Sequence, residues 1–353
     1  MIGNNAAWDT ATTDPANRAT QAVSLNVAGV AVSGGTYAIT GTGFGALDQT
    51  AQMFDDFELE DIGAIQDFKS ELVRNNKYAG LNITDSKFVS GTRCISNDYS
   101  LGDFPELYVP LSGLTKRAYL SCHIFIDGSF DYTGTGGRPV WKFARIGAGS
   151  VYSGKPKASA EYTNTSNAHL ITTPEVLSGT ISPVDGGLTY AIHDQANADI
   201  ASVITSGEWH FYECEFYSGT TDQMDCYFLE RWDGIETITY VDRNFLSAAD
   251  SSLPTWFLTP LNGLGDYFPF TLYMDNLHVN ESGARVVMTD SPVYANSTKW
   301  AGQPINNYTS GSVTVTSKRQ GFSVGGSAYL HLFNAVGVLV SEGNAIEVQE
   351  DAA

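Results

Sequence analysis

The sequence predicts an all-β protein, and three observations support this. Glycine is frequent, with 35 among 353 residues, while aromatic residues reach 12% and charged residues only 16%. Turn-forming residues recur between short runs that alternate apolar and polar residues, as in antiparallel sandwiches. No long stretch has the 3.6-residue apolar period of an amphipathic helix. The chain is long enough for two domains with separate cores.

The charge of the chain excludes two classes of partner. The formal net charge is -20, whereas nucleic acids and anionic membranes both select basic surfaces. The N-terminus has no basic start followed by an apolar core, so we expect a soluble protein that its own sequence does not export. Its four cysteines have no zinc-ligand spacing, and we expect buried free thiols rather than disulfides.

The first 50 residues divide into an arm and a pair of strands. Residues 1–22 are small, polar and without pattern, as in an N-terminal arm that becomes ordered on a partner. Residues 23–50 alternate as a strand pair around the Gly34-Gly35 turn. The glycine-rich loop Gly41–Gly45 has no following lysine and no helix, so we interpret it as a tight turn and not a phosphate site.

Two families resemble successive parts of the chain. SGGTYAITGTGFGA, residues 33–46, resembles the opening of an immunoglobulin-like IPT/TIG domain, and residues 298–348 resemble its second half. MFDDFELEDIG, residues 53–63, and TLYMDNLHV, residues 271–279, resemble the first and last strands of a concanavalin-A-like jelly roll of the laminin-G or legume-lectin type. These resemblances imply a jelly-roll sandwich inserted into a smaller Ig-like sandwich.

The predicted boundaries follow from that insertion. The jelly roll covers 51–288, and the Ig-like domain is discontinuous, with 23–50 joined to 289–353. An insert whose first and last strands are neighbours returns the chain to its starting point at little cost to the host. Strands of the jelly roll are expected near 88–89, 119–126, 140–146, 189–193, 237–241 and 256–258.

The central element of the jelly roll is a predicted hairpin across residues 207–234. We expect the turn at 218–222, which pairs Cys214 with Cys226. Side chains alternate across a strand, so Glu213, Glu215 and Asp225 are expected to share one polar face.

Those three acids are the strongest catalytic candidates in the chain. Laminarinase-like hydrolases of the jelly-roll family carry two acids on one strand, and a retaining mechanism needs two carboxyl groups about 5 Å apart. The third acid of the family motif is absent here. An acidic surface patch is the alternative interpretation, and the sequence predicts no catalytic residue beyond these candidates.

Alginate lyases of the same fold provide a second comparison. Their motifs resemble Ser70–Arg74, Ala191–His193 and Leu272–Met274, although the leading arginine and the glutamine of the family motifs are missing. His193 would be the general base in such an enzyme, but a histidine on a strand is more often structural.

Binding sites for a cation and a sugar can also be proposed from the sequence. Asp55 and Asp275 lie on strands expected to be adjacent, and their oxygens could hold Ca²⁺; a strand-ending role for Asp275 is the alternative. No other cofactor is expected. Aromatic residues that could stack on sugar rings, together with His193, are Trp141, Tyr190, Trp232 and Trp256.

The combination of this architecture with a polar arm and no export signal resembles bacteriophage virion proteins. It implies a non-enzymatic component of a capsid or tail, made in the host cytoplasm. Its partners would be other virion proteins, further copies of the chain and glycans. A polysaccharide hydrolase or lyase using Glu213 and Glu215 is the alternative, and a purely structural protein without ligand is a third.

Overall fold

The fold is known from a computed structural model. It describes residues 26–42, 44, 53–64, 73–74, 81–98, 107–110, 117–128, 140–147, 157–164, 170–177, 203–217, 226–243, 255–258, 261–263, 270–335 and 337–351. The predicted arm, residues 1–22, lies outside these ranges. Most of the described residues are in antiparallel strands, which confirms the predicted fold class. No helix among them could cross a membrane.

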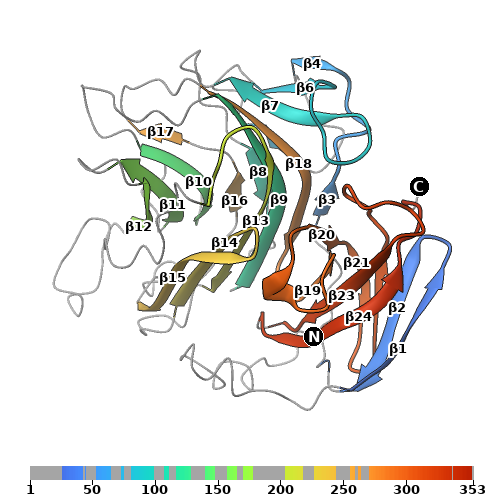
Figure 1. Ribbon diagram of the computed structural model, residues 1–353. Helices are drawn as coiled ribbons and strands as arrows, with labels where there is room; N and C mark the ends of the chain where they lie inside the picture. Colours follow the sequence, from blue (N-terminus) through green and yellow to red (C-terminus); the bar gives the residue numbers. More distant parts are fainter. Residues whose placement is uncertain are drawn as a thin grey trace.

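Two large sheets form the jelly roll (Figure 1). The nine-stranded sheet runs in the order β15 (Ile235–Arg243), β14 (Cys226–Trp232), β13 (Trp209–Tyr217), β9 (Arg117–Gly128), β18 (Phe270–Asn280), β7 (Cys94–Asp98), β6 (Leu81–Thr84), β4 (Gly63–Ala64), with β3 (Met53–Asp55) also on β18. The seven-stranded sheet runs β12 (Leu170–Leu177), β11 (Lys157–Asn164), β10 (Val140–Gly147), β16 (Thr255–Leu258), β8 (Leu107–Pro110), β5 (Val73–Arg74), with β17 (Leu261–Gly263) on β10.

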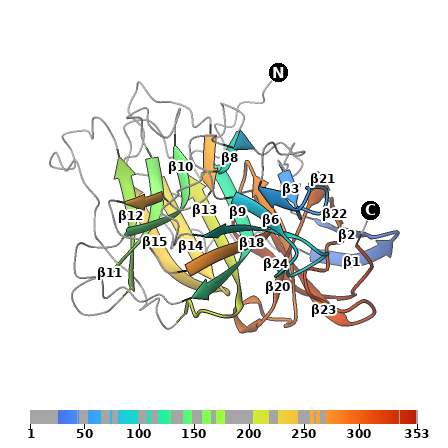
Figure 2. The same cartoon turned by 90° about the horizontal axis from the view of Figure 1, so that it is seen from above.

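Two four-stranded sheets, which we call the terminal unit, combine both ends of the chain. One is β1 (Asn26–Ser33), β2 (Thr36–Thr42), β22 (Ser312–Thr316), β21 (Ile305–Tyr308), and the other is β20 (Trp300–Gln303), β19 (Arg285–Thr289), β23 (Ser327–Phe333), β24 (Leu339–Glu347). A short 3-10 helix, Tyr294–Asn296, joins β19 to β20. Figures 1 and 2 show this unit beside the nine-stranded sheet, which separates it from the seven-stranded sheet.

The core of the terminal unit forms from residues far apart in sequence. Tyr37 and Ile39 of β2 pack with Val313 and Val315 of β22, and all four are fully buried. The Tyr308 hydroxyl donates a hydrogen bond of 2.8 Å to the carbonyl oxygen of Phe44. The alternation of apolar residues in these strands therefore predicted their buried faces correctly. In the other sheet of this unit, β19 begins at Arg285. The domain boundaries and membership of the IPT/TIG family stay predictions.

The hairpin of β13 and β14 exists, but its pairing differs from the prediction. Cys214 lies opposite Glu230, not Cys226, so the register is shifted by four residues. An even shift keeps every residue on its predicted face. Cys94, Cys122 and Cys214 are free and buried, as expected.

The nine-stranded sheet has two distinct faces. His210, Tyr212 and Cys214 lie on what we call its inner face, toward the seven-stranded sheet. Phe211, Glu213 and Glu215 lie on its outer face, where Phe211 stacks on Trp300 of the terminal unit. The terminal unit therefore covers the face that the sequence predicted to be acidic and open.

Residues 88–89 do not form the predicted strand. The backbone N–H groups of Val89 and Ser90 donate instead to the Asp275 carboxylate, at 2.8 and 3.2 Å. The Asp275 carboxylate therefore accepts the hydrogen bonds that the carbonyl groups of a neighbouring strand would accept in a sheet.

Candidate functional site

Glu213 and Glu215 are buried beneath the terminal unit, each with 2% of its surface exposed. Arg285 of β19 is fully buried between them. Its Nε lies 3.2 Å from Oε1 of Glu213, and its Nη1 lies 3.3 Å from Oε2 of Glu215. The positive charge that balances the two carboxylates is therefore the guanidinium of Arg285.

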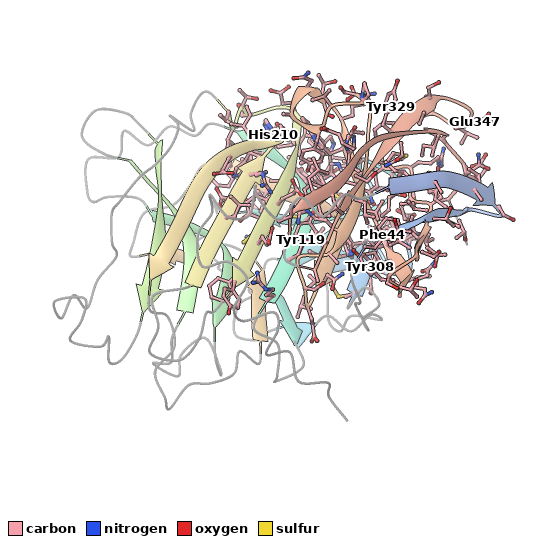
Figure 3. The ribbon with its side chains drawn as sticks, turned by 90° about the horizontal axis from the view of Figure 1, so that it is seen from below. Phe44, Tyr119, His210, Tyr308, Tyr329 and Glu347 are labelled. Carbon is pink, nitrogen blue, oxygen red and sulfur yellow. The ribbon has the colours of Figure 1, made fainter. Side chains whose placement is uncertain are left out.

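Two tyrosines complete the hydrogen bonding of Glu213. The hydroxyl of Tyr119, on β9, donates to Oε1 at 2.8 Å, and that of Tyr294 donates to Oε2 at 2.5 Å. Figure 3 shows Tyr119 at the border between the curved sheet and the terminal strands. Burial, and then the negative charge of Glu213, raise the pKa of both tyrosines well above the usual value, so they remain donors.

The guanidinium of Arg285 also packs against aromatic rings. Its central carbon lies 3.7 Å from the ring centroid of Phe333 and 4.6 Å from that of Tyr119. Burial alone would lower the pKa of Arg285, but the charges of Glu213 and Glu215 raise it, so the side chain stays charged.

Main chain of the terminal unit closes the space over Glu215. A Cβ added to Gly337 would lie 1.9 Å from Oε1 of Glu215, and one added to Gly283 would lie 3.0 Å from the same oxygen. A glycosidase needs room for a sugar ring and a water beside its carboxylates. Glu213 and Glu215 have no such room, which argues against a catalytic role, and at 2% exposure they do not form an exposed acidic patch.

The other predicted site residues lie in different parts of the molecule. Trp232 is fully buried on the inner face, where its Nε1 donates to Glu230 at 3.2 Å, so it cannot stack on a sugar. Asp225, Tyr190 and His193 fall outside the described residues. Trp141 and Trp256 are described by their backbone alone, on β10 and β16.

The three segments that resemble alginate-lyase motifs are not brought together by the described chain. Val73–Arg74 is an edge of the seven-stranded sheet, while Tyr273 lies on the outer face of the nine-stranded sheet, opposite Phe125. Ala191–His193 is outside the described residues. The two described segments, Val73–Arg74 and Leu272–Met274, lie on different sheets.

Asp55 and Asp275 lie on paired strands, as predicted, with Leu277 opposite Asp55. The carboxylate of Asp275 accepts hydrogen bonds from the N–H groups of Val89, Ser90 and Asn276. Burial raises its pKa to about 7 despite these donors. No group of three or more metal-binding side chains occurs among the described residues.

Calcium binding at Asp55 and Asp275 stays a prediction, because Ca²⁺ requires six to eight oxygens. A higher melting temperature with added Ca²⁺, lost in Asp275→Asn, would support it. An unchanged melting temperature would count against it.

A polar row crosses the middle of the seven-stranded sheet. Its backbone register aligns five residues from five neighbouring strands: Tyr108, Phe257, Arg145, Ser159 and Glu175. A second row, one step along, contains Lys142, Glu161 and Thr173. Residues directly opposite share a face, so both rows lie on the same side of the sheet.

The opposite face of this sheet carries Trp141 and Ile146 of β10. It also carries Val109 of β8, which lies in the same row as Ile146 and Trp256 and is 1% exposed. Val109 is the residue of this face whose burial the structure describes, and Figure 1 shows the nine-stranded sheet on one side of the seven-stranded sheet. By backbone register, the two polar rows lie on the face opposite Val109.

The sequence contained a signal for these rows that the motif comparison missed. KASAEYTN alternates polar with apolar residues, as a half-buried strand does, while VWKFARIG has its two charges three residues apart. Register alone decides which charges meet, and the bulge between Phe143 and Arg145 brings Arg145 onto the face of Lys142.

Comparison with solved structures found similarity to polysaccharide lyases. The alginate lyase Aly36B matches with 16% identity and a TM-score of 0.45, over 65% of this chain and 96% of that one. An endo-β-1,4-glucuronan lyase from the fungus Trichoderma reesei matches with 11% identity and a TM-score of 0.43, over 65% and 95%. Alginate lyase vAL-1 from Chlorella virus matches with 14% identity and a TM-score of 0.41, over 56% and 88%.

No family model and no curated protein matches the chain. The three solved structures named above are described as polysaccharide lyases. This finding corrects the expectation of a non-enzymatic virion component.

Proposed function

We propose that this chain is a polysaccharide lyase that cleaves a uronic-acid-containing polysaccharide on the face of the seven-stranded sheet that carries the two polar rows. The observation that carries the proposal is the row Tyr108–Phe257–Arg145–Ser159–Glu175 beside Lys142 and Glu161. It combines cations, a carboxylate, a phenol and an aromatic residue on one surface, built on strands and not on loops.

A lyase needs these groups for β-elimination. A base removes the proton at C5 of the uronate, the C–H electrons form the C4=C5 double bond, and the C4–O bond breaks. The departing oxygen then takes a proton. Negative charge grows on the uronate carboxylate as the C5 proton leaves, so a cation beside it lowers the barrier.

Each of these tasks has a candidate in the two rows. Arg145 suits the uronate carboxylate, because its guanidinium can bind both oxygens at once, and Lys142 adds a second positive charge. Glu161, opposite Lys142, is the proton acceptor. Tyr108 is the proton donor to the departing oxygen, and Phe257 offers an aromatic surface to a sugar ring.

The test is degradation of defined acidic polysaccharides. The purified chain is incubated with alginate, polyglucuronate or polygalacturonate, and ultraviolet absorbance follows the new double bond. A hydrolase would release reducing ends without this absorbance. We expect absorbance with at least one substrate and a loss of at least about 100-fold in Arg145→Ala and Glu161→Gln, since general acid–base catalysis contributes roughly 10²–10⁴-fold.

The matched control is Lys299→Ala, which removes an exposed lysine of the terminal unit and should leave activity unchanged. The proposal would be overturned if the parent protein released neither the unsaturated product nor new reducing ends from any of the three substrates. Full activity in both Arg145→Ala and Glu161→Gln would exclude the proposed face as the active site.

A further inference from the structure

A row of aromatic residues crosses the outer face of the nine-stranded sheet, apart from the proposed lyase site. Trp209 of β13 lies opposite Phe125 of β9, and Phe125 lies opposite Tyr273 of β18. The ring of Phe125 is 5.6 Å from that of Trp209 and 6.0 Å from that of Tyr273, edge to face in both pairs. Three neighbouring strands thus present one continuous aromatic strip.

The strip remains accessible on both sides of its centre. Phe125 is 9% exposed, but Trp209 and Tyr273 are each half-buried. The terminal unit covers the next row, where Phe211 stacks on Trp300 at an interplanar angle of 4°. The terminal unit therefore covers the row of Phe211 but leaves the neighbouring row, which contains the strip, accessible.

Polar groups border the strip. The ammonium of Lys87 lies 4.4 Å from the ring centroid of Phe125 and 5.7 Å from that of Tyr273, and it pairs with Asp127 at 3.4 Å. Asp127 keeps 52% of its side chain exposed. Glu208, next to Trp209 in sequence, is exposed as well.

We propose that this strip, formed by Trp209, Phe125 and Tyr273, binds a neutral glycan. Aromatic rings offer the apolar faces of sugar rings a flat surface, and carboxylates accept hydrogen bonds from hydroxyl groups. The strip spans three strands about 4.8 Å apart, which suits a short stretch of an extended chain. The carboxylates of Asp127 and Glu208 outnumber the single ammonium of Lys87. The net negative charge beside the strip therefore disfavours an acidic polysaccharide.

A protein partner fits these observations less well. Stable protein interfaces bury about 800 Å² on each partner, and charged residues such as lysine and aspartate are depleted from their centres. The strip is one residue wide, and Lys87 and Asp127 lie beside its central residue, Phe125. The glycan is therefore the occupant we assign.

The experiment measures binding of the full chain to soluble neutral polysaccharides: a β-glucan, an arabinoxylan and a galactomannan, by affinity electrophoresis. Alginate serves as the acidic comparison. We expect retardation in at least one neutral gel, weakened about tenfold in Trp209→Ala and in Tyr273→Ala, or about 1.4 kcal/mol. Tyr329→Ala is the control, because this half-buried tyrosine lies on β23 in the terminal unit.

Trp209→Phe keeps a ring in place and should retain part of the binding, which separates loss of stacking from loss of folding. Lyase activity on acidic substrates should be the same in Trp209→Ala as in the parent, so the two proposals fail separately. No retardation in any neutral gel, or equal retardation of all variants, would overturn this inference. Self-association of the parent that Trp209→Ala abolishes would also overturn it, in favour of a protein interface.

Discussion

Arg285 and Glu213 form an ion pair across the interface of the two units, with Nε and Oε1 3.2 Å apart and neither side chain more than 2% exposed. β19 of the terminal unit and β13 of the jelly roll are thereby held in one relative position. The pair requires that position because a buried charge without its partner is strongly unfavourable.

Removing the cation should be far more damaging than removing the whole network. Arg285→Met leaves Glu213 and Glu215 buried without a counter-charge, and we expect a loss of about 3–5 kcal/mol in the free energy of unfolding. Arg319→Ala, which breaks the half-exposed pair with Asp351, should cost about 1 kcal/mol or less. Urea denaturation measures both.

A triple variant, Arg285→Met with Glu213→Gln and Glu215→Gln, tests the physical cause. It removes all the buried charges, so it should recover much of the stability lost in Arg285→Met. If the triple variant is no more stable than Arg285→Met, packing and not charge explains the loss.

Two glycines with the same backbone angle provide a matched pair. Gly337 and Gly325 both have φ of +74°, but a Cβ would lie 1.9 Å from Glu215 Oε1 at Gly337 and would meet nothing within 4 Å at Gly325. Gly325→Ala should lose roughly 1–2 kcal/mol from backbone strain alone. Gly337→Ala should lose about 2 kcal/mol more, because the buried carboxylate must move. Equal losses in denaturation midpoints would contradict the proposed contact.

From the environment of His210 we expect the folded protein to lose stability at alkaline pH. Its Nδ1 lies 2.6 Å from Asp233 Oδ2, and its Nε2 lies 2.9 Å from the Thr205 carbonyl oxygen, nearer than the Thr205 N–H at 3.2 Å. In the protonated ring both nitrogens donate, Nδ1 to Asp233 and Nε2 to the Thr205 carbonyl oxygen. Burial lowers the pKa of His210, but Asp233, the Thr205 carbonyl and the charge of Glu208 raise it above 6.5 overall.

A raised pKa in the folded state means that this stabilisation is complete below pH 6.5 and is lost as pH rises through the folded value. Asp233→Asn keeps the backbone, since asparagine tolerates its φ of +49°, but removes the charge. The variant should lose less stability between pH 6 and pH 9 than the parent. Parallel denaturation midpoints across that range would exclude this role for His210.

From the burial of His278 we expect the folded protein to lose stability at acidic pH. Its side chain is fully buried, and neither ring nitrogen has a partner among the described residues. Burial, and then the charge of Arg285, lower its pKa to about 4. The unfolded chain binds this proton more tightly, so stability falls as pH drops from 6.5 toward 4, by up to about 3 kcal/mol.

His278→Leu should flatten the pH dependence of the melting temperature between pH 4 and pH 6.5. Its stability at pH 7 is expected to be equal or higher, since the unpaired polar ring is gone. A parent and variant with the same slope in acid would show that other groups, such as His123, control the acid limb.

The sequence predicted the hairpin faces better than the hairpin register. Alternation placed Glu213 and Glu215 together, because only parity matters for a face. Their burial could not be predicted, since it depends on Arg285 and Gly337, which arrive 70 or more residues later on other sheets. The polar row through Arg145 was hidden for a related reason: its five members come from strands whose order is set by tertiary pairing.

The pairing of β2 with β22 also limits when the terminal unit can fold during synthesis. Val313 is synthesised about 270 residues after Ile39, its partner in the sheet, which takes roughly 15–50 s at ordinary rates of translation. During that interval β2 has no β22 to pair with, so half of its backbone donors and acceptors face water or a chaperone. The jelly roll can fold on the ribosome in the meantime, whereas the terminal unit can close only after β22 has been synthesised.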